Sequence, residues 1–399
     1  MAQATKQYHI KITSITPVCI GDGQKLSPFS DYKLKVDKLI YLNQETIQQI
    51  LKTRPNLIED FVKGIITGMD NTGSKFDIES FFYNRAKVDL ASITLKTIDS
   101  TAVPKGNKNL YTIIKNAGVH PYIPGSSLKG AVKTALLYNW LMDKNNHWCK
   151  DYLKSGDKNS IGNLSKKEED NLQNEKKALE EELNNKLNSF EFAVSDSDLF
   201  SEDSIKAIDT KRLHLKEGKF TIPQTWEAIK ENSSATLSIS SIKMGKDELL
   251  NWTQIYKVIN LFSQNSNDIE WEIFDNCCGE NNKFDDDIYN SLFSFYNSIE
   301  KNINNADATT CYLRLGSGKG YYFNSIGLAL YNADETEDKK LFVNFLRNNG
   351  FGKIFNRKNK QWEEFDLQSD EFPLTRVLDF KTSNPLGWVK LELLKEKEL

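Results

Sequence analysis

The chain has 399 residues, of which 39% are hydrophobic and 27% are charged, and its formal net charge is −3. This composition predicts a folded chain with a large core, and the near-neutral charge argues against a protein that simply coats a polyanion. No apolar run approaches the roughly eighteen residues of a membrane span, and the N-terminus has no signal-peptide pattern, so we expect a cytoplasmic protein.

The first part of the chain predicts a strand and then an insertion. Alternating apolar and polar residues from Tyr8 onward predict a strand that ends in a turn at Gly21 and Gly23. A helix is expected near residues 39–52, and the residues after it, to about position 99, predict an irregular, partly helical insertion.

A glycine-rich turn separates the next strand from the next helix. Extended chain is expected over 110–123, and Pro124 and Gly125 then end it. Ser126 or Ser127 is the expected N-cap of a helix that runs to Leu141. Its core side chains recur at helical spacing and are Leu128, Val132, Ala135, Leu136 and Trp140.

The second half of the chain alternates strands with helices. A densely charged, solvated helix is expected over 166–190, and an amphipathic helix over 247–262, before an acidic insertion at 267–287. Strand-like segments are expected near 190–200 and 235–242, on both sides of a glycine-rich loop at 316–320, and near 372–380 and 387–394, with a further helix near 339–349.

Without the insertions, the element order is β-α-β-β-α-β, which predicts an α+β fold of the ferredoxin-like type that RNA-recognition modules also use. We expect a core over residues 1–330 with helical insertions at about 45–110, 143–190 and 265–308. Residues 331–399 are expected to form a helical and strand extension packed on that core.

Two windows of the sequence, 100–142 and 308–333, contain no carboxylate. Each window contains one glycine-rich loop, and together they place basic side chains where no acidic neighbour in the sequence offsets them. Such a pattern indicates an anion-binding surface. The basic residues of the two windows are Lys105, Lys108, Lys115, Lys129, Lys133, Arg314 and Lys319.

The first loop, at Gly125, is interpreted as a phosphate site. Unpaired amides and the helix dipole favour an anion at a helix N-terminus, where Ser126, Ser127 and Lys129 add donors and Lys133 lies one turn further on. The alternative interpretation of this loop is a plain turn followed by a helix cap. The nucleotide-binding P-loop is excluded because neither loop has Lys-Ser or Lys-Thr after its last glycine.

The second loop strengthens the anion-binding interpretation. Its three alternating glycines leave backbone amides unshielded, basic residues flank them, and three aromatic residues follow. Basic groups beside aromatic rings are typical of single-stranded nucleic-acid sites. The alternative is a tight hairpin that sends at least one of Tyr321, Tyr322 and Phe323 into the core. The candidate RNA-binding residues here are Arg314, Gly316, Ser317, Gly318, Lys319, Gly320 and Tyr321.

No convincing catalytic, metal or cofactor site is found. His120 is the best-placed histidine for metal-free RNA cleavage, and Asp22 and Asp31 follow the first strand. Asp196 and Asp198 have a spacing that a metal site permits, but carboxylates that bind backbone amides are the favoured interpretation. The five cysteines lack C-x-x-C spacing, which indicates reduced thiols rather than a zinc site or a disulfide framework.

The stretches "YIPGSSLKGAVKTAL" and "RLGSGKGYYFNSIG" together resemble the paired glycine-rich motifs of the RAMP superfamily of CRISPR-associated proteins. The segments "PVCIGDG" before "DYKL", then "VSDSDLF", "EAIKENS" and "FPLTR", follow in the order of one subfamily. That subfamily is the type III-A (Csm) effector subunit that caps the complex at the 3′ end of the crRNA. The loop "GSGKG" departs from the commoner family form, which has an aromatic residue where this chain has Ser317.

The resemblance implies a non-catalytic subunit that binds crRNA, stacks on the neighbouring backbone RAMP subunit, and assists crRNA 3′-end maturation by host nucleases. It implies no cofactor and no membrane partner. Asp22 and Asp31 lie where the slicing backbone subunit has its aspartate, but the surrounding pattern differs, so that role is not carried over. Two alternatives stay open: a RAMP endoribonuclease that processes precursor crRNA, and a purely structural protein–protein adaptor.

Overall fold

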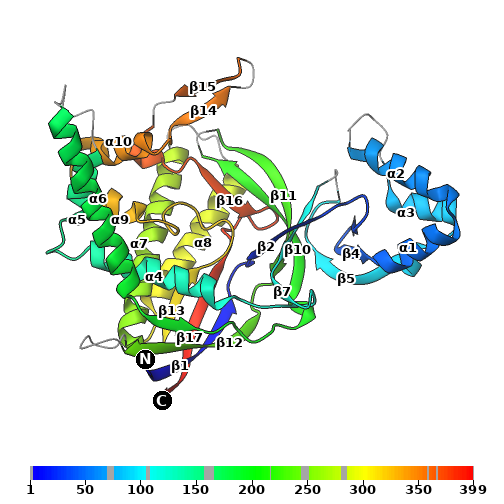
Figure 1. Ribbon diagram of the computed structural model, residues 1–399, viewed down its shortest axis with the longest axis horizontal. Coiled ribbons are helices and arrows are strands. Elements are labelled where there is room, and N and C mark those ends of the chain that lie inside the picture. The colour runs from blue at the N-terminus through cyan, green and yellow to red at the C-terminus, as the bar shows by residue number, and fades with distance from the viewer. Residues whose placement is uncertain are drawn as a thin grey trace.

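The computed structural model describes residues 3–69, 76–104, 108–156, 166–215, 217–243, 251–279, 285–356, 359–364 and 367–398. Two sheets with helices packed around them form these parts of the chain, as Figure 1 shows, so the expected α+β class is confirmed. Within these ranges, no helix combines the length and the apolar composition that crossing a bilayer requires.

The first sheet has five strands, and every neighbouring pair is antiparallel. Tyr8, Ile10 and Ile12 alternate along its middle strand and are fully buried, because successive side chains of a strand point to opposite faces. In sheet order the strands are β13 (Thr310–Arg314), β17 (Trp388–Glu398), β1 (Gln3–Ser14), β12 (Ser234–Lys243) and β9 (Phe192–Val194).

The expected elements β1, α4 (Gly125–Leu141), β9, β12, α7 (Trp252–Gly279) and β13 occur in that order along the chain. In the sheet, however, β17 lies between β1 and β13. Trp388, Val389 and Leu391 of this strand are fully buried. Residues that were expected to form a C-terminal extension therefore pair with β1 inside the first sheet.

A second sheet of eight strands was not expected from the sequence. No strand was expected at residues 205–214, where β10 lies; buried polar residues such as Asp209 and Thr210 interrupt the apolar pattern of this strand. In sheet order the strands are β2 (Gly21–Leu26), β6 (Leu110–Ile113), β11 (Lys219–Ile229), β10 (Ile205–His214), β5 (Thr94–Ser100), β4 (Lys38–Leu42) and β3 (Tyr32–Lys35), with β16 (Thr375–Asp379) paired to β10.

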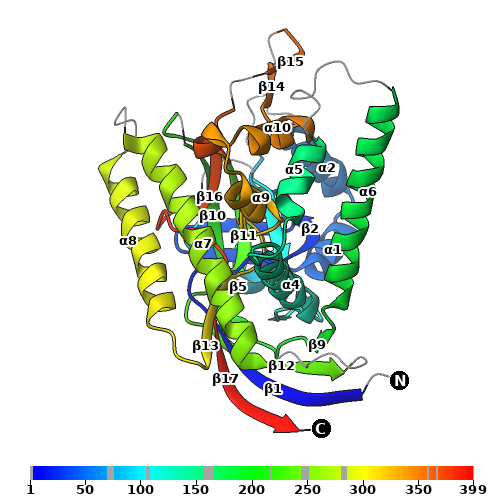
Figure 2. The ribbon, with the colours of Figure 1, turned by 90° about the vertical axis from the view of Figure 1, so that its left-hand side faces the viewer.

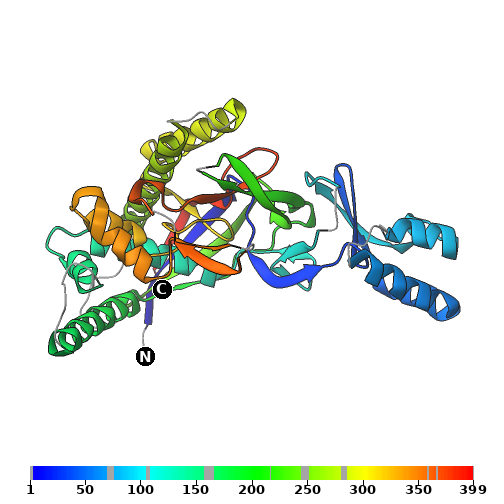
Figure 3. The ribbon, with the colours of Figure 1, turned by 90° about the horizontal axis from the view of Figure 1, so that it is seen from above.

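The insertion between β4 and β5 forms a helical lobe at one end of the molecule, far from α6 and α10 in Figures 1 and 3. Its small apolar core is separate from the main core and includes Ile47, Leu57 and Phe82. Its elements are α1 (Gln44–Thr53), α2 (Asn56–Met69), α3 (Ile78–Phe81), the π-helix η1 (Phe82–Ala86) and the 3₁₀-helix η2 (Leu90–Ile93).

The acidic segment 267–287 is not simply an inserted surface loop, as was expected. Its first half continues α7, where Ile273 and Phe274 are buried in the main core, and its end begins α8. Figure 2 shows α7 and α8 side by side. The charged helix that was expected near residues 166–190 is α6. The remaining elements are α5 (Trp148–Gly156), α6 (Lys166–Ser189), α8 (Asp286–Asn304), α9 (Gly327–Ala333), α10 (Lys340–Asn348), the hairpins β7 (Lys115–Asn116)–β8 (His120–Pro121) and β14 (Lys353–Asn356)–β15 (Gln361–Glu364), and the 3₁₀-helices η3 (Glu202–Ser204), η4 (Glu337–Lys339) and η5 (Ser369–Glu371).

Candidate nucleic-acid interface

The first glycine loop is the junction between β8 and α4. The helix begins at Gly125 with Pro124 as its N-cap, so the expected serine cap is wrong. Gly125 packs on the segment after β9, where a Cβ atom would lie 2.6 Å from the carbonyl oxygen of Ser195. Only glycine fits this close backbone approach.

A carboxylate from the chain itself already lies at the N-terminus of α4. The amide of Gly125 donates to Oδ1 of Asp196 at 2.8 Å. Asp198, two residues on, accepts the hydroxyl hydrogen of Thr236. The interpretation as a carboxylate that binds a backbone amide is therefore confirmed for Asp196, which supplies the negative charge that a helix N-terminus favours, whereas Asp198 binds a side-chain hydroxyl.

Four polar side chains of the first loop differ in their exposure and in the contacts that they make. Ser126 is exposed, and Ser127 is half-buried. The amine of Lys129 lies 5.6 Å from the ring centroid of Phe192 and is also half-buried. Lys133 donates to the carbonyl oxygen of Leu187 at 3.0 Å, and burial together with the Lys129 charge lowers its pKa. Lys133 thus holds the end of α6 against α4.

The second glycine loop follows β13 and has an unusual backbone. Gly316, Gly318 and Gly320 have φ angles of 73°, 86° and 79°, a region that favours glycine. The amide of Ser317 donates to the carbonyl oxygen of Cys19 at 2.7 Å. The loop is therefore anchored to the link between the first strands of the two sheets.

Arg314 supports this loop from inside the protein. Its side chain is 2% exposed and pairs at 2.8 Å with Glu270 of α7, which is 1% exposed. A second guanidinium nitrogen donates to the carbonyl oxygen of Gly318 at 2.8 Å, and Nε donates to that of Leu386 at 3.1 Å. The guanidinium also lies 4.9 Å from the ring centroid of Phe323. Arg314 is thus a positioning residue for the loop.

The remaining residues of this loop divide between core and surface. Tyr322 and Phe323 are buried, which confirms that at least one aromatic residue enters the core, and Tyr321 packs edge-to-face on Phe351 and Phe372. A helix, α9, follows the loop where a strand was expected, so that prediction is wrong. Lys319 is half-buried, and burial together with the Arg314 charge lowers its pKa.

Tertiary contacts supply the carboxylates that the first acid-free window lacks. Lys108 pairs with buried Asp209 at 2.7 Å, and Lys115 pairs with fully buried Glu227 at 2.5 Å. Lys105 lies outside the described residues. Both carboxylates come from β10 and β11, the strands that the sequence analysis did not assign.

The candidate cleavage residues are engaged in local contacts. Asp22 accepts the hydroxyl hydrogen of Thr112 at 2.6 Å, and Asp31 accepts the amide of Ser27 at 2.7 Å. Nδ1 of His120 lies 3.2 Å from the carbonyl oxygen of Phe200. Among the described residues, no three His, Cys, Asp or Glu side chains gather in a way that would hold a metal ion.

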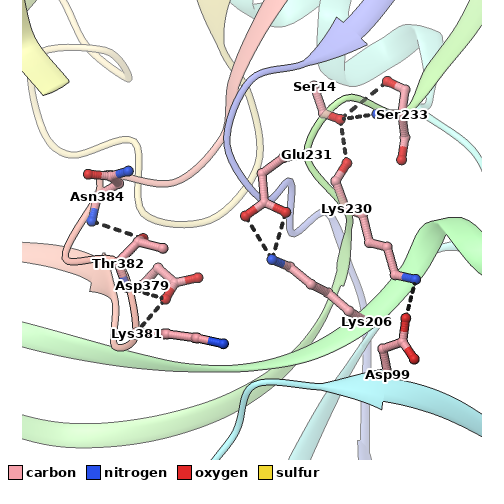
Figure 4. Close-up of polar contacts among 10 residues, drawn as sticks. All are labelled: Ser14, Asp99, Lys206, Lys230, Glu231, Ser233, Asp379, Lys381, Thr382 and Asn384. Atoms are coloured by element: carbon pink, nitrogen blue, oxygen red, sulfur yellow. Dashed lines mark hydrogen bonds and ion pairs between the residues drawn. The ribbon is translucent and has the colours of Figure 1, made fainter. Parts of the chain in front are cut away.

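The sequence analysis missed a polar cluster at the ends of β10, β11 and β16 (Figure 4). Lys206 pairs with Glu231 at 2.7 Å, and Lys230 pairs with Asp99 at 2.6 Å. Asp379 is 1% exposed; its Oδ1 accepts the amide of Lys381 at 2.7 Å, and burial raises its pKa. These contacts join strand ends of the second sheet.

The fold and the site together define the class of protein: an α+β protein with two glycine-rich loops beside lysines. Residues 11–372 match the RAMP superfamily. The chain therefore belongs to the RAMP superfamily, as the paired motifs around Gly125 and Gly316 predicted.

Individual relatives are similar over almost the whole length. The CRISPR system Cms protein Csm5 of Methanocaldococcus jannaschii is 26% identical over 97% of this chain and 89% of its own. A chain of the cryo-EM structure of a Csm-crRNA-target RNA ternary complex in a type III-A CRISPR-Cas system has a TM-score of 0.62 and 20% identity, over 98% of this chain and 100% of that one. The crystal structure of T. onnurineus Csm5 has a TM-score of 0.48 and 16% identity, over 95% and 99%.

Proposed function

We propose that the chain is a non-catalytic, crRNA-binding subunit of a type III-A Csm complex that caps the 3′ end of the crRNA and assists its maturation. Membership of the RAMP superfamily and the Csm5 relative support this proposal. The observation that carries it is the 316–320 loop, whose three glycines have positive φ angles on both sides of half-buried Lys319 and whose Gly318 carbonyl oxygen accepts a hydrogen bond from Arg314.

Two groups of residues make the proposed phosphate contacts. At the first loop these are Ser126, Ser127 and Lys129. At the second they are Ser317 and Lys319, with the backbone of Gly316, Gly318 and Gly320 and the ring of Tyr321 beside them. Gly125, Lys133 and Arg314 act by positioning these groups, because their polar atoms bind other parts of the chain. Phosphate contacts of this kind fix an RNA strand without reading its sequence.

The finer fold assignment is part of the proposal. The antiparallel order β9, β12, β1, β17 supports a ferredoxin-like core, with α4 and α7 as its helices and β13 as an added edge strand. In this assignment β17, not β13, is the fourth strand of the core.

The test is co-expression of the chain with the neighbouring Csm subunits and a CRISPR array, followed by recovery of RNA with this chain. Replacing Lys129 and Lys319 together by alanine is expected to weaken RNA retention and to reduce the salt slope by about one and a half units, because each lysine contributes about 0.7 on a single strand. The control is Lys63→Ala, a 73% exposed lysine on α2. Retention and slope unchanged in the folded double variant would contradict the assignment.

The endoribonuclease alternative depends on His120, whose Nε2 lies 3.8 Å from Glu202. Incubating the chain with repeat RNA in the absence of metal tests this alternative against the main proposal. Cleavage that His120→Ala abolishes would establish the alternative, and intact RNA would exclude it.

One observation favours an additional adaptor role toward a neighbouring backbone RAMP subunit. Four apolar side chains on one face of α2 are between 43% and 65% exposed. They recur at helical spacing, and such a contiguous apolar stripe marks a protein interaction surface more often than an isolated residue does. The four residues are Ile58, Val62, Ile66 and Met69.

A further inference from the structure

A pocket of about 330 Å³ lies between β10, β11 and the turn after β16, away from both glycine loops. Its walls are mainly apolar: Phe220 and Pro223 come from β11, Phe380 follows β16, and Val103 lies in the link after β5. Phe380 is 36% exposed and Val103 is 39% exposed, so the apolar walls reach the surface. This volume is at the lower end of the range for ligand pockets and suits one small planar group.

The amine of one lysine lies close to both aromatic walls. Nζ of Lys211 is 4.4 Å from the ring centroid of Phe220 and 2.8 Å from that of Phe380. These distances limit the separation of the two centroids to about 7 Å, which is twice the stacking distance of about 3.4 Å between bases. Two aromatic rings within reach of one amine provide faces on which a planar group can stack.

The charge of the pocket favours an anionic ligand. Lys108 and Lys211 both line it, and the carboxylate of Asp209 is already bound by three donors: the amide of Val103, the hydroxyl of Thr225 and the amine of Lys108. Asp209 therefore fixes Lys108 and does not repel a ligand through an unpaired oxygen. Burial, with a smaller contribution from the charge of Lys108, lowers the pKa of Lys211, and the Asp209 carboxylate opposes this shift.

The pocket connects to the second glycine loop through β16. A Cβ atom on Gly318 would lie 3.5 Å from Cβ of Val377, so the loop contacts this strand. Phe380 follows Val377 by three residues, about 10 Å of extended chain. Side chains three residues apart on a strand point to opposite faces, so an RNA strand that contacts both Lys319 and the pocket passes around β16.

From this geometry we propose that the pocket takes one unstacked nucleobase of the bound RNA, held between Phe220 and Phe380, with Lys211 and Lys108 facing the adjoining phosphate. The inference rests on the proposed RNA-binding function and adds the pocket to the glycine loops as a further contact with the RNA. Stacking on aromatic rings is independent of base identity, so the pocket fixes the path of the strand and not its sequence.

The experiment uses the full chain, co-expressed with the neighbouring subunits and an array that yields crRNA containing 4-thiouridine. After irradiation, mass spectrometry is expected to find crosslinked nucleotide on the peptides that contain Phe220 or Phe380. Phe380→Ala is expected to lower crosslinking and RNA affinity about tenfold, the loss typical of one stacked base, and Phe380→Tyr to restore both. The matched control is Tyr83→Ala, a 60% exposed aromatic residue that lies beside Glu79 and Asp89.

Three results would overturn the inference. In the first, the wild-type chain retains RNA without crosslinks at either phenylalanine, and folded Phe380→Ala binds RNA with unchanged affinity. This result would exclude base binding in the pocket but would not contradict the proposed function. Crosslinking of free 4-thiouridine monophosphate without crosslinking of RNA would assign the pocket to a mononucleotide. Loss of RNA from the wild-type chain itself would contradict the proposed function and the pocket together. Thermal unfolding of each variant establishes that it is folded.

Discussion

Arg314 is the residue on which the second glycine loop depends. Its guanidinium joins α7 through Glu270, the loop through Gly318, and the segment before β17 through Leu386. The side chain that the sequence analysis placed among the RNA contacts thus binds three parts of the chain, and the sequence carries no sign of this because Glu270 lies 44 positions away.

Removing Arg314 is expected to destabilise the protein. Arg314→Ala leaves Glu270 as an unpaired buried charge, which typically costs about 3–5 kcal/mol, so the free energy of unfolding should fall by that amount in denaturant titrations. The matched control is Arg85→Ala, which breaks a pair whose side chains are 56% and 38% exposed. That change should cost at most about 1 kcal/mol. Equal effects of the two substitutions would contradict the role given to Arg314.

Asp379 predicts a pH-dependent stability. Burial raises its folded-state pKa above the unfolded value of 3.8, so the folded state binds the proton more tightly. Its contribution to stability is therefore greatest below that value and is lost as the pH rises through the folded pKa. Asp379→Asn keeps the Oδ1 acceptor for Lys381 without the buried charge.

Thermal unfolding should show that Asp379→Asn is at least as stable as the wild-type chain near pH 7. The difference between the two should shrink as the pH approaches about 4, because the wild-type carboxyl is then protonated as well. A variant that is less stable at neutral pH by an amount independent of pH would show that the carboxylate is needed in its charged form.

At the scale of elements, α4 shows which glycines of a motif are structural. Gly125 meets the backbone after β9, whereas a Cβ atom on Gly130 would meet nothing within 4 Å. We expect Gly125→Ala to lower the melting temperature and to displace α4 from the 194–197 segment. Gly130→Ala should be neutral or stabilising by about 0.5–1 kcal/mol, since alanine favours a helix over glycine. The opposite order of melting temperatures would contradict the packing described for this junction.

Long elements with a strong pattern were predictable from the sequence, and the contacts between them were not. The core positions Leu128, Val132 and Ala135 of α4 were identified from their spacing and are buried. The lysines of the acid-free windows were not placed correctly by pattern alone, because Asp209 and Glu227 approach Lys108 and Lys115 only in the folded sheet. A sequence window without carboxylates therefore did not produce a surface without them.

At the scale of the whole molecule, topology limited the prediction. The expected fold had one sheet. In the structure, the last 25 residues contribute a strand to each of two sheets: β17 belongs to the first sheet and β16 to the second. Strand pairing across almost the full chain length, as between His9 and Lys395, leaves no local pattern from which the pairing can be inferred. The glycine-rich loops were found because the glycines themselves are visible in the sequence, whereas the partners that position these loops come from distant elements.

The central claim is that this chain caps the 3′ end of the crRNA. The most direct measurement is to sequence the 3′ ends of crRNA from Csm complexes assembled with the wild-type chain, with the Lys129 and Lys319 double-alanine variant, and without the chain. The account predicts defined ends with the wild-type chain and longer, heterogeneous ends in the other two samples. Identical 3′ ends in all three would contradict it.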